Sequence, residues 1–252
     1  MSLGIDQRWI EAVVLAGVRI VAFLFIAPPF SYNAIPAQIK AMLGVALALA
    51  VSPLVTSKYV PLDTAAFLGA VILEVLVGAV LGFMVMLVFS AVQAAGNLID
   101  LFGGFQLAQA FDPQSLVNGA QFTRSFQMTA LALLFASGGH QLIIGGLARS
   151  FTALPLGAGI DLTTPVQTLT TGVTQMFLAS VQIAGPLLIV LFLADAGLGL
   201  LTRVAPALNA FALGFPLKIA ITVILSSVVF VALPAIVSSL TGSAVQALLG
   251  VK

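Results

Sequence analysis

The chain has 252 residues, of which 61% are hydrophobic and only 7% are charged, and its formal net charge is +1. This number of polar side chains is too small to cover the surface of a water-soluble domain. Lipid or other protein must therefore surround most of this chain. The basic residues stand singly, which excludes the basic stripe of a nucleic-acid-binding protein. The absence of cysteine excludes disulfides, thiolate metal sites and iron–sulfur clusters.

Hydrophobic segments of about the length that crosses a membrane recur along the chain, and they predict an all-α fold with five or six helices. The first spans Ile10 to Ala27 and ends at Pro28-Pro29. The residues before it do not form a basic leader, so we expect them to be retained. The second segment spans Ala41 to Ser52, follows a turn that ends at Pro36, and stops near Pro53.

The third segment, Ala65 to Val92, is longer than a perpendicular crossing needs, so it must tilt, bend or project beyond the bilayer. Phe126 to Ala148 follows and is broken at Gly138-Gly139. The last two segments, Val173 to Ala194 and Ile219 to Leu240, are uncharged, and each contains a proline that favours a kink.

A polar, threonine-rich stretch from Gly157 to Thr174 separates a longer N-terminal part from a C-terminal helical pair. Lysine and arginine are spread too evenly over the short connections to predict which side of the membrane each connection faces.

Glu74, Gly78 and Gly82 recur at a spacing of four, which places a carboxylate and a Gly-x-x-x-Gly pair along one helix face. We expect that face to meet protein. For Glu74 the spacing favours a packing role near a helix end or an interface over a proton relay. An isolated carboxylate at the bilayer centre costs on the order of 3 kcal/mol, so Glu74 needs a partner or water.

Asp195, Gly199 and Arg203 repeat this spacing, but about 12 Å of helix separates the two charges, so they cannot pair with each other. We expect each to pair elsewhere. A transporter would use Asp195 as an ion-coupling acid, whereas the pattern favours a hydrogen-bonded packing residue, with Arg203 as an interfacial anchor.

Ser137 and His140 are residue types that a hydrolase uses as nucleophile and base. The sequence has no Gly-x-Ser-x-Gly elbow, and the two glycines between them favour a turn at a helix end. A lone histidine without cysteine cannot make a typical zinc site. The sequence therefore predicts no catalytic residue, metal or cofactor.

The stretch from Gly103 to Gln121 interrupts the membrane-like sequence with glycines, aromatic residues and a turn. Irregular backbone at membrane depth is tolerated only when it is buried in protein or lines a cavity. The composition leaves open whether this stretch is a plug or gate, or an ordinary connection. The candidate plug or gate residues are Phe105, Phe111, Asp112, Pro113, Gln114 and Ser115.

An ordered set of short motifs between Arg19 and Pro216 resembles the FliR family of flagellar export-gate proteins, which is related to the corresponding subunit of virulence type III secretion. The motifs are Arg19-Ile20, Ala27-Pro28-Pro29-Phe30-Ser31, Ala34-Ile35-Pro36, Phe111-Asp112-Pro113-Gln114-Ser115, Leu154-Pro155-Leu156-Gly157, Gly199-Leu200-Leu201-Thr202-Arg203-Val204-Ala205-Pro206-Ala207-Leu208-Asn209 and Gly214-Phe215-Pro216.

The resemblance implies a non-enzymatic, single-copy subunit of a helical export-gate assembly, in the bacterial inner membrane at the flagellar basal body. Residues 1–160 would be a FliP-like helical part and residues 161–252 a FliQ-like hairpin. The implied partners are FliP-like and FliQ-like subunits, an FlhB-like export protein, unfolded flagellar export substrates and membrane lipid, with no nucleic acid. A virulence export-gate subunit and an ion-coupled solute transporter are the alternatives.

By its position, the stretch from about 105 to 121 is similar to the family's plug loop, which sits in the closed channel. Asn97 and Asp100 depart from the acidic residue and glycine that are commoner there, and Asp195 stands where asparagine is usual. We expect the following residues to serve packing and assembly: Arg19, Pro28, Pro29, Pro36, Glu74, Gly78, Gly82, Asp195, Arg203, Pro206, Asn209, Gly214 and Pro216.

Overall fold

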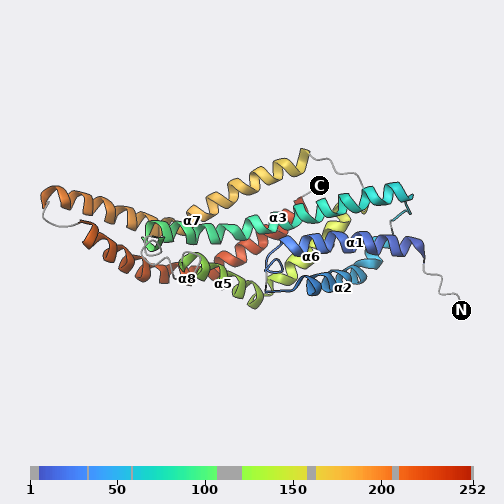
Figure 1. Ribbon diagram of the computed structural model, residues 1–252, viewed down its shortest axis with the longest axis horizontal. Helices are drawn as coiled ribbons and strands as arrows, with labels where there is room; N and C mark the ends of the chain where they lie inside the picture. The colour runs from blue at the N-terminus through green and yellow to red at the C-terminus, as the bar shows by residue number, and fades with distance from the viewer. Residues whose placement is uncertain are drawn as a thin grey trace. The chain divides into compact units, whose positions relative to one another are not determined.

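The computed structural model describes residues 6–32, 34–57, 59–106, 121–157, 163–205 and 210–250. These residues form helices without any strand, which confirms the all-α prediction. The helices are α1 (Gln7–Ile26), α2 (Ala37–Thr56), α3 (Thr64–Phe102), α5 (Gln121–Ala136), α6 (Gly139–Ala153), α7 (Thr163–Val204) and α8 (Ala210–Gly250) (Figure 1).

Five helices in the described part of the chain are long and apolar enough to cross a membrane, namely α1, α2, α3, and most of α7 and α8. The pair α5 and α6 makes a sixth span if its two halves are taken together, although they are bent by 74° at the break between them. The predicted five or six apolar helices are therefore confirmed, as is the break at Gly138-Gly139.

The predicted helix ends are wrong at several places, because an apolar window marks hydrophobic depth while a helix continues as long as its backbone hydrogen bonds do. Helix α2 runs through Pro53 to Thr56, because a proline removes only the hydrogen bond from its own nitrogen to the carbonyl four residues earlier, and the other hydrogen bonds of the helix can still form. Helix α3 continues ten residues beyond Val92, through polar residues, and α7 already begins at Thr163, inside the polar stretch.

The chain packs into two compact units, each assembled from separate stretches of sequence. Unit 1 comprises Met1–Phe89, Ser137–Val173 and Leu240–Lys252, and unit 2 comprises Ser90–Ala136 and Thr174–Ser239. The long helices α3, α7 and α8 each contribute residues to both units. The predicted division near residue 160 into FliP-like and FliQ-like parts concerns similarity to other proteins and not compactness, and it stays a prediction.

In unit 1, α1 and α2 lie side by side (Figure 1). Leu15, Ala16 and Phe23 of α1 are fully buried and follow helical spacing, as expected for the inward face of a helix. Gly44 of α2 packs against Val21 of α1 so closely that a Cβ atom at Gly44 would overlap the valine side chain. Small residues thus let these two helices approach each other.

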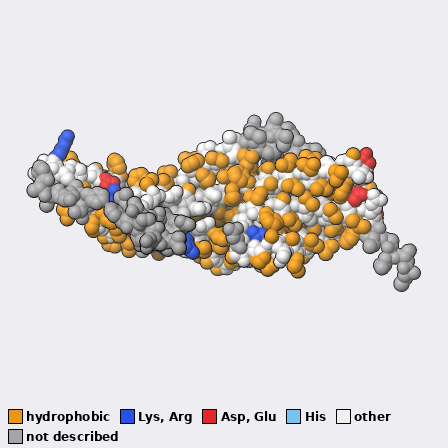
Figure 2. Space-filling view, viewed as in Figure 1, with side chains coloured by type: hydrophobic (Ala, Val, Ile, Leu, Met, Phe, Trp, Pro, Cys, Tyr) orange, Lys and Arg blue, Asp and Glu red, His pale blue; other side chains and the backbone are white. Residues whose placement is uncertain are grey.

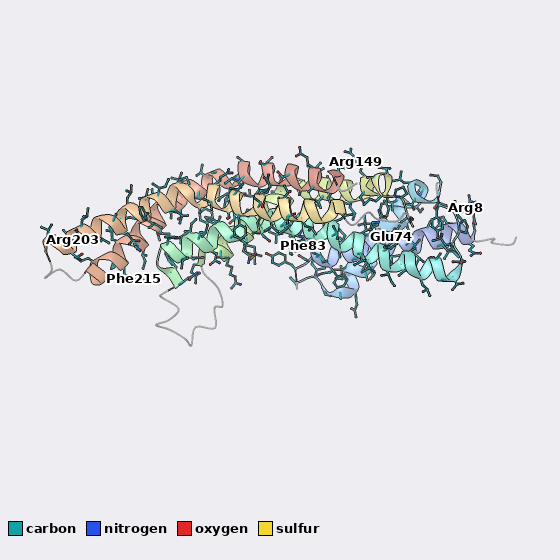
Figure 3. All side chains as sticks on the ribbon, turned by 90° about the horizontal axis from the view of Figure 1, so that it is seen from above. Arg8, Glu74, Phe83, Arg149, Arg203 and Phe215 are labelled. Carbon is teal, nitrogen blue, oxygen red and sulfur yellow. The ribbon has the colours of Figure 1, made fainter. Side chains whose placement is uncertain are left out.

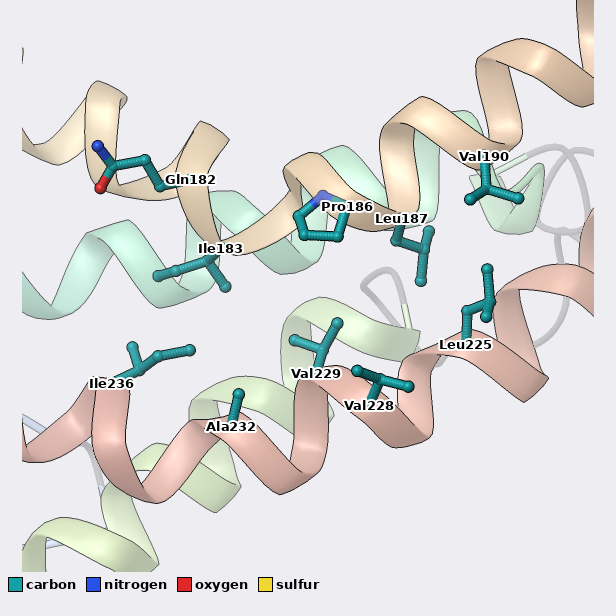
Figure 4. A pocket seen from close by; sticks show the side chains of 10 residues that line it. All are labelled: Gln182, Ile183, Pro186, Leu187, Val190, Leu225, Val228, Val229, Ala232 and Ile236. Atoms are coloured by element: carbon teal, nitrogen blue, oxygen red, sulfur yellow. The ribbon is translucent and has the colours of Figure 1, made fainter.

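In unit 2, α7 and α8 form a hairpin with an apolar groove of about 350 Å³ between them (Figure 4). Pro186, the proline that favours a kink in the segment Val173 to Ala194, lies inside α7 and lines this groove. The core continues to α5, where Phe126 is fully buried and meets Phe230 of α8 edge to face, with ring centroids 5.0 Å apart.

Much apolar surface is left uncovered within this chain. Figure 2 shows a face dominated by hydrophobic side chains with few charges among them. Only 22% of the most apolar window is buried in α2, and the same holds for α8. Exposed apolar surface of this extent requires lipid or partner proteins around the chain.

Candidate functional site at the base of segment 107–120

Most of the predicted plug lies outside the described residues: Phe111, Asp112, Pro113, Gln114 and Ser115 all belong to segment 107–120. Phe105 is described, and so are both flanks of the segment. We call the contacts between these flanks and the end of α3 the loop base.

The N-terminal flank leaves α3 through two glycines. The Gly103 N–H donates to the Ile99 carbonyl at 2.8 Å, which closes the last turn of the helix. Gly104 follows with φ +84°, the left-handed region that side chains disfavour. A Cβ atom at Gly103 would lie 2.7 Å from the Thr222 Oγ1 atom, and one at Gly104 would lie 3.3 Å from the Phe215 ring. The two glycines therefore end α3 and let α8 approach it.

The C-terminal flank is fixed by Asp100, a carboxylate that is fully buried on α3. Its Oδ1 atom accepts the Phe122 N–H at 3.0 Å, and its Oδ2 atom accepts the Thr123 N–H and the Thr123 hydroxyl, each at 2.8 Å. These N–H groups belong to the first turn of α5, where no carbonyl of the same helix can pair with them. Asp100 thus acts as an N-terminal cap supplied by another helix, and its negative charge suits the positive end of the helix dipole.

Three further contacts hold the flanks to α3 and to each other. A Cβ atom at Gly96 would lie 2.6 Å from the Thr123 Cα atom, so only glycine permits this approach. The Asn97 side chain accepts a hydrogen bond from the Gln106 amide at 3.0 Å. The rings of Phe105 and Phe122 meet edge to face, with centroids 5.1 Å apart. The chain therefore leaves and re-enters this region at the last two turns of α3.

In the sequence alone, Asn97 and Asp100 stand out only as departures from the family pattern. A signal for their role was present, because two polar residues one helical turn apart interrupt an apolar helix just before the irregular stretch. Their partners lie 9 to 23 residues further along the chain, so no local pattern could identify them.

Glu74 has the partner that the sequence required but did not name. In unit 1 the Arg19 guanidinium donates to both carboxylate oxygens of Glu74, at 2.5 and 3.0 Å, and both residues are almost fully buried. The remaining terminal nitrogen of Arg19 donates to the Leu154 carbonyl at 2.9 Å. The guanidinium also lies 4.4 Å from the centre of the Phe151 ring, and the Gly157 N–H approaches Glu74 at 3.4 Å.

This geometry favours the packing interpretation of Glu74, because a carboxylate held at both oxygens by an always-charged arginine is poorly suited to carry protons. The face of Glu74 also meets protein within the chain, as expected. A Cβ atom at Gly78 would overlap the Arg19 carbonyl, and one at Gly82 would lie 3.0 Å from the Phe23 carbonyl. Figure 3 marks Glu74 on its helix. A role of these residues in assembly stays a prediction.

Asp195 pairs with Lys218 across the α7–α8 hairpin, with 2.6 Å between Oδ1 and Nζ. The prediction that Asp195 pairs with a residue other than Arg203 is therefore confirmed. Arg203 lies in the last turn of α7, where a positive charge suits the helix dipole, and it stands with Phe215 at one end of the hairpin (Figure 3). Gly214 faces Leu198 across the hairpin, and a Cβ atom there would lie 3.0 Å from it.

The predicted assembly prolines have separate positions. Pro28 and Pro29 follow α1 and are joined by a cis peptide bond, Pro36 caps the start of α2, and Pro216 lies within α8. Pro206 and Asn209 fall outside the described residues. The described contacts do not bring the prolines together into one site.

Ser137 and His140 lie at the junction of α5 and α6. Gly138 has φ +72° and caps the start of α6, so the predicted helix-end turn is confirmed. Among the described residues no group of three histidine, aspartate or glutamate side chains is placed to hold a metal ion.

The connection between α2 and α3 is fastened to the start of α1 by Glu11. Its Oε2 atom accepts the Tyr59 hydroxyl at 2.9 Å and the Leu62 N–H at 3.3 Å, while Oε1 accepts the Gln7 side chain. Burial, together with the hydrogen bond to Glu11, raises the pKa of Tyr59 to about 12.

Tyr59 should therefore remain a phenol well above its ordinary pKa of 10.0. A group whose folded-state pKa is raised contributes stability below its unfolded pKa, and that contribution is lost as the pH rises from about 10 to 12. The chain has only two tyrosines, so the absorbance of tyrosinate can follow each of them. We expect a transition near pH 12 that Tyr59→Phe removes and Tyr32→Phe leaves in place. Titration of Tyr59 near its ordinary pKa would contradict this.

The five or six long apolar helices among the described residues define a polytopic, all-helical membrane protein. Residues 10–244 match the family described as bacterial export proteins, family 1, and the chain belongs to that family. The predicted resemblance is confirmed, and it places the chain among the components of type III export apparatus.

Individual relatives agree with this assignment. The chain is 31% identical over 213 residues to the flagellar biosynthetic protein FliR of Escherichia coli K12, covering 84% of this chain and 82% of that protein. It is 32% identical over 234 residues to FliR of Bacillus subtilis 168, covering 87% and 88%. It is also 28% identical over 222 residues to the surface presentation of antigens protein SpaR of Shigella sonnei, covering 84% and 85%.

Proposed function

We propose that this chain is a non-enzymatic subunit of the flagellar type III export gate, that it helps to form the channel for unfolded flagellar proteins, and that segment 105–121 plugs that channel. The flagellar assignment is supported by FliR proteins that match at 27 to 32% identity over 84 to 87% of this chain, while the virulence relatives match at 28 to 30% over 71 to 84%. Service in a virulence export gate is the second candidate, because SpaR relatives match over a similar length.

The observation that carries the plug proposal is the loop base. Both flanks of segment 107–120 are held at the last two turns of α3, by the Asp100 carboxylate on one side and by the Asn97 side chain on the other. Segments with their two ends held together can project as a unit from a rigid scaffold, which suits a plug more than a stretched connection.

The uncovered apolar surface supports assembly with other subunits. We propose FliP-like and FliQ-like subunits and an FlhB-like export protein as partners, in the inner membrane at the flagellar basal body. In this arrangement residues 1–160 occupy a FliP-like position and the C-terminal hairpin a FliQ-like one, with lipid covering the remaining apolar surface. The transporter alternative has no comparable support, since Glu74 and Asp195 are both paired with basic residues.

Deletion of the gene tests the flagellar assignment. We expect cells without this chain to lose their flagellar filaments, because the gate has no substitute for a single-copy subunit, while other secretion continues. Filament counts by electron microscopy and the secretion of a virulence substrate are the two measurements. Normal filaments together with lost virulence secretion would support the second candidate function. Normal filaments together with normal virulence secretion would refute both export functions.

A further inference from the structure

We infer that Asp100 is a positioning residue that keeps α5 fixed to α3, and so sets the resting position of the loop base. The inference rests on the proposed function, because its consequence is measured on a closed channel. It goes beyond that function by assigning the resting state to one side chain.

The first argument is the chemistry of the contact. Asp100 is fully buried, and within the described part of the chain its two oxygens accept three hydrogen bonds from Phe122 and Thr123 at the start of α5. Hydrogen bonds to an ionised acceptor are roughly twice as strong as those between neutral groups. A buried carboxylate that loses hydrogen-bond donors does so at a large cost in free energy. Separation of α5 from α3 is therefore strongly disfavoured.

The second argument is that the backbone around Asp100 is shaped for this contact. One turn earlier on α3, Gly96 allows the Thr123 backbone to approach so closely that a Cβ atom would lie 2.6 Å from its Cα atom. The Phe105 and Phe122 rings meet beside it. A carboxylate, a glycine and an aromatic pair thus act on the same first turn of α5, from independent positions in the sequence.

Three variants that remove different numbers of hydrogen bonds test the contact. The resting ion conductance of each is measured in the purified, assembled complex, reconstituted into planar bilayers. Asp100→Ala removes both acceptors and should raise the resting ion conductance by roughly tenfold or more. Asp100→Asn keeps one acceptor oxygen but turns an amide toward a donor, so we expect a smaller rise. Thr123→Val removes only the hydroxyl donor and leaves both backbone N–H groups bound, so its conductance should stay near that of the wild type.

Matched controls separate positioning from general damage. Asp63→Ala also removes a capping carboxylate, one that accepts the Ala66 N–H at 2.7 Å at the start of α3, and it should leave the conductance unchanged. Gly96→Ala should raise the conductance although it leaves Asp100 unchanged. Gly69→Ala on the same helix adds a Cβ atom that meets nothing within 4 Å, so it should leave the conductance unchanged. A purely structural fault would lower complex yield and filament number together, while lost positioning raises conductance with both retained.

A variant in which a short linker replaces residues 107–120 separates the two possible failures. If that variant does not leak, the plug itself is refuted. If it leaks but assembled Asp100→Ala and Gly96→Ala complexes stay tight, the inference about Asp100 is refuted and the plug stands. Should Asp100→Ala fail to assemble, Asp100→Asn decides, and wild-type conductance from its assembled complex overturns the inference.

Discussion

Replacing residues 107–120 with a short glycine-serine linker is expected to leave the export gate assembled but to make it leaky to ions at rest. The expectation follows from the loop base, since Gln106 and Phe122 are both held at the end of α3 and a short linker joins them without disturbing either. A segment that fills a narrow apolar passage excludes water and ions by bulk and by dewetting, so its removal opens a conducting path.

The measurement is single-channel conductance of the reconstituted complex, with complex yield as the check on assembly. A linker of the same length as the natural segment, but made only of glycine and serine, is the matched control. It restores the chain length, but not the volume of the aromatic and turn residues, so an intermediate leak is expected. Wild-type conductance in the short-linker complex would mean that the segment is a plain connection.

Loss of the Glu74 carboxylate is expected to be the most destabilising single change in unit 1. Glu74→Ala leaves the Arg19 guanidinium buried without a counter-charge, and breaking a buried pair in this way costs about 3–5 kcal/mol. The turn after α6 should loosen as well, because the same guanidinium holds the Leu154 carbonyl. We expect a lower steady-state level of the chain and a lower midpoint of thermal unfolding of the complex.

A double-mutant cycle completes this experiment, built from the single variants Arg19→Met and Glu74→Leu and from their combination. Arg19→Met with Glu74→Leu removes both charges and should be much less damaging than either single loss, since well-packed apolar replacements of buried pairs are often neutral. Exchanging the two residues should not restore stability, because a carboxylate at position 19 cannot donate to the Leu154 carbonyl. Equal stability of Glu74→Ala and the wild type would show that the pair contributes nothing in the assembly.

The helices could be predicted from the sequence because apolar residues so outnumber charged ones that only helical, membrane-type packing satisfies the backbone. Their ends could not. Helix α3 passes through Asn97 and Asp100 to Phe102 because those side chains find partners elsewhere in the fold instead of competing with their own backbone. Helix α2 passes Pro53 because the proline removes a single hydrogen bond of the helix and leaves the others in place.

The sequence by itself determined the class of protein, the number of apolar helices, the family, and the need of Glu74 and Asp195 for partners, because each of these follows from composition, spacing or ordered motifs. Only the tertiary structure decided which side chains these residues pair with. Arg19 and Glu74 stand 55 residues apart, and Asp100 meets Thr123 across 23 residues. Such pairings depend on which helix faces approach one another in three dimensions, and short-range periodicity carries no information about that.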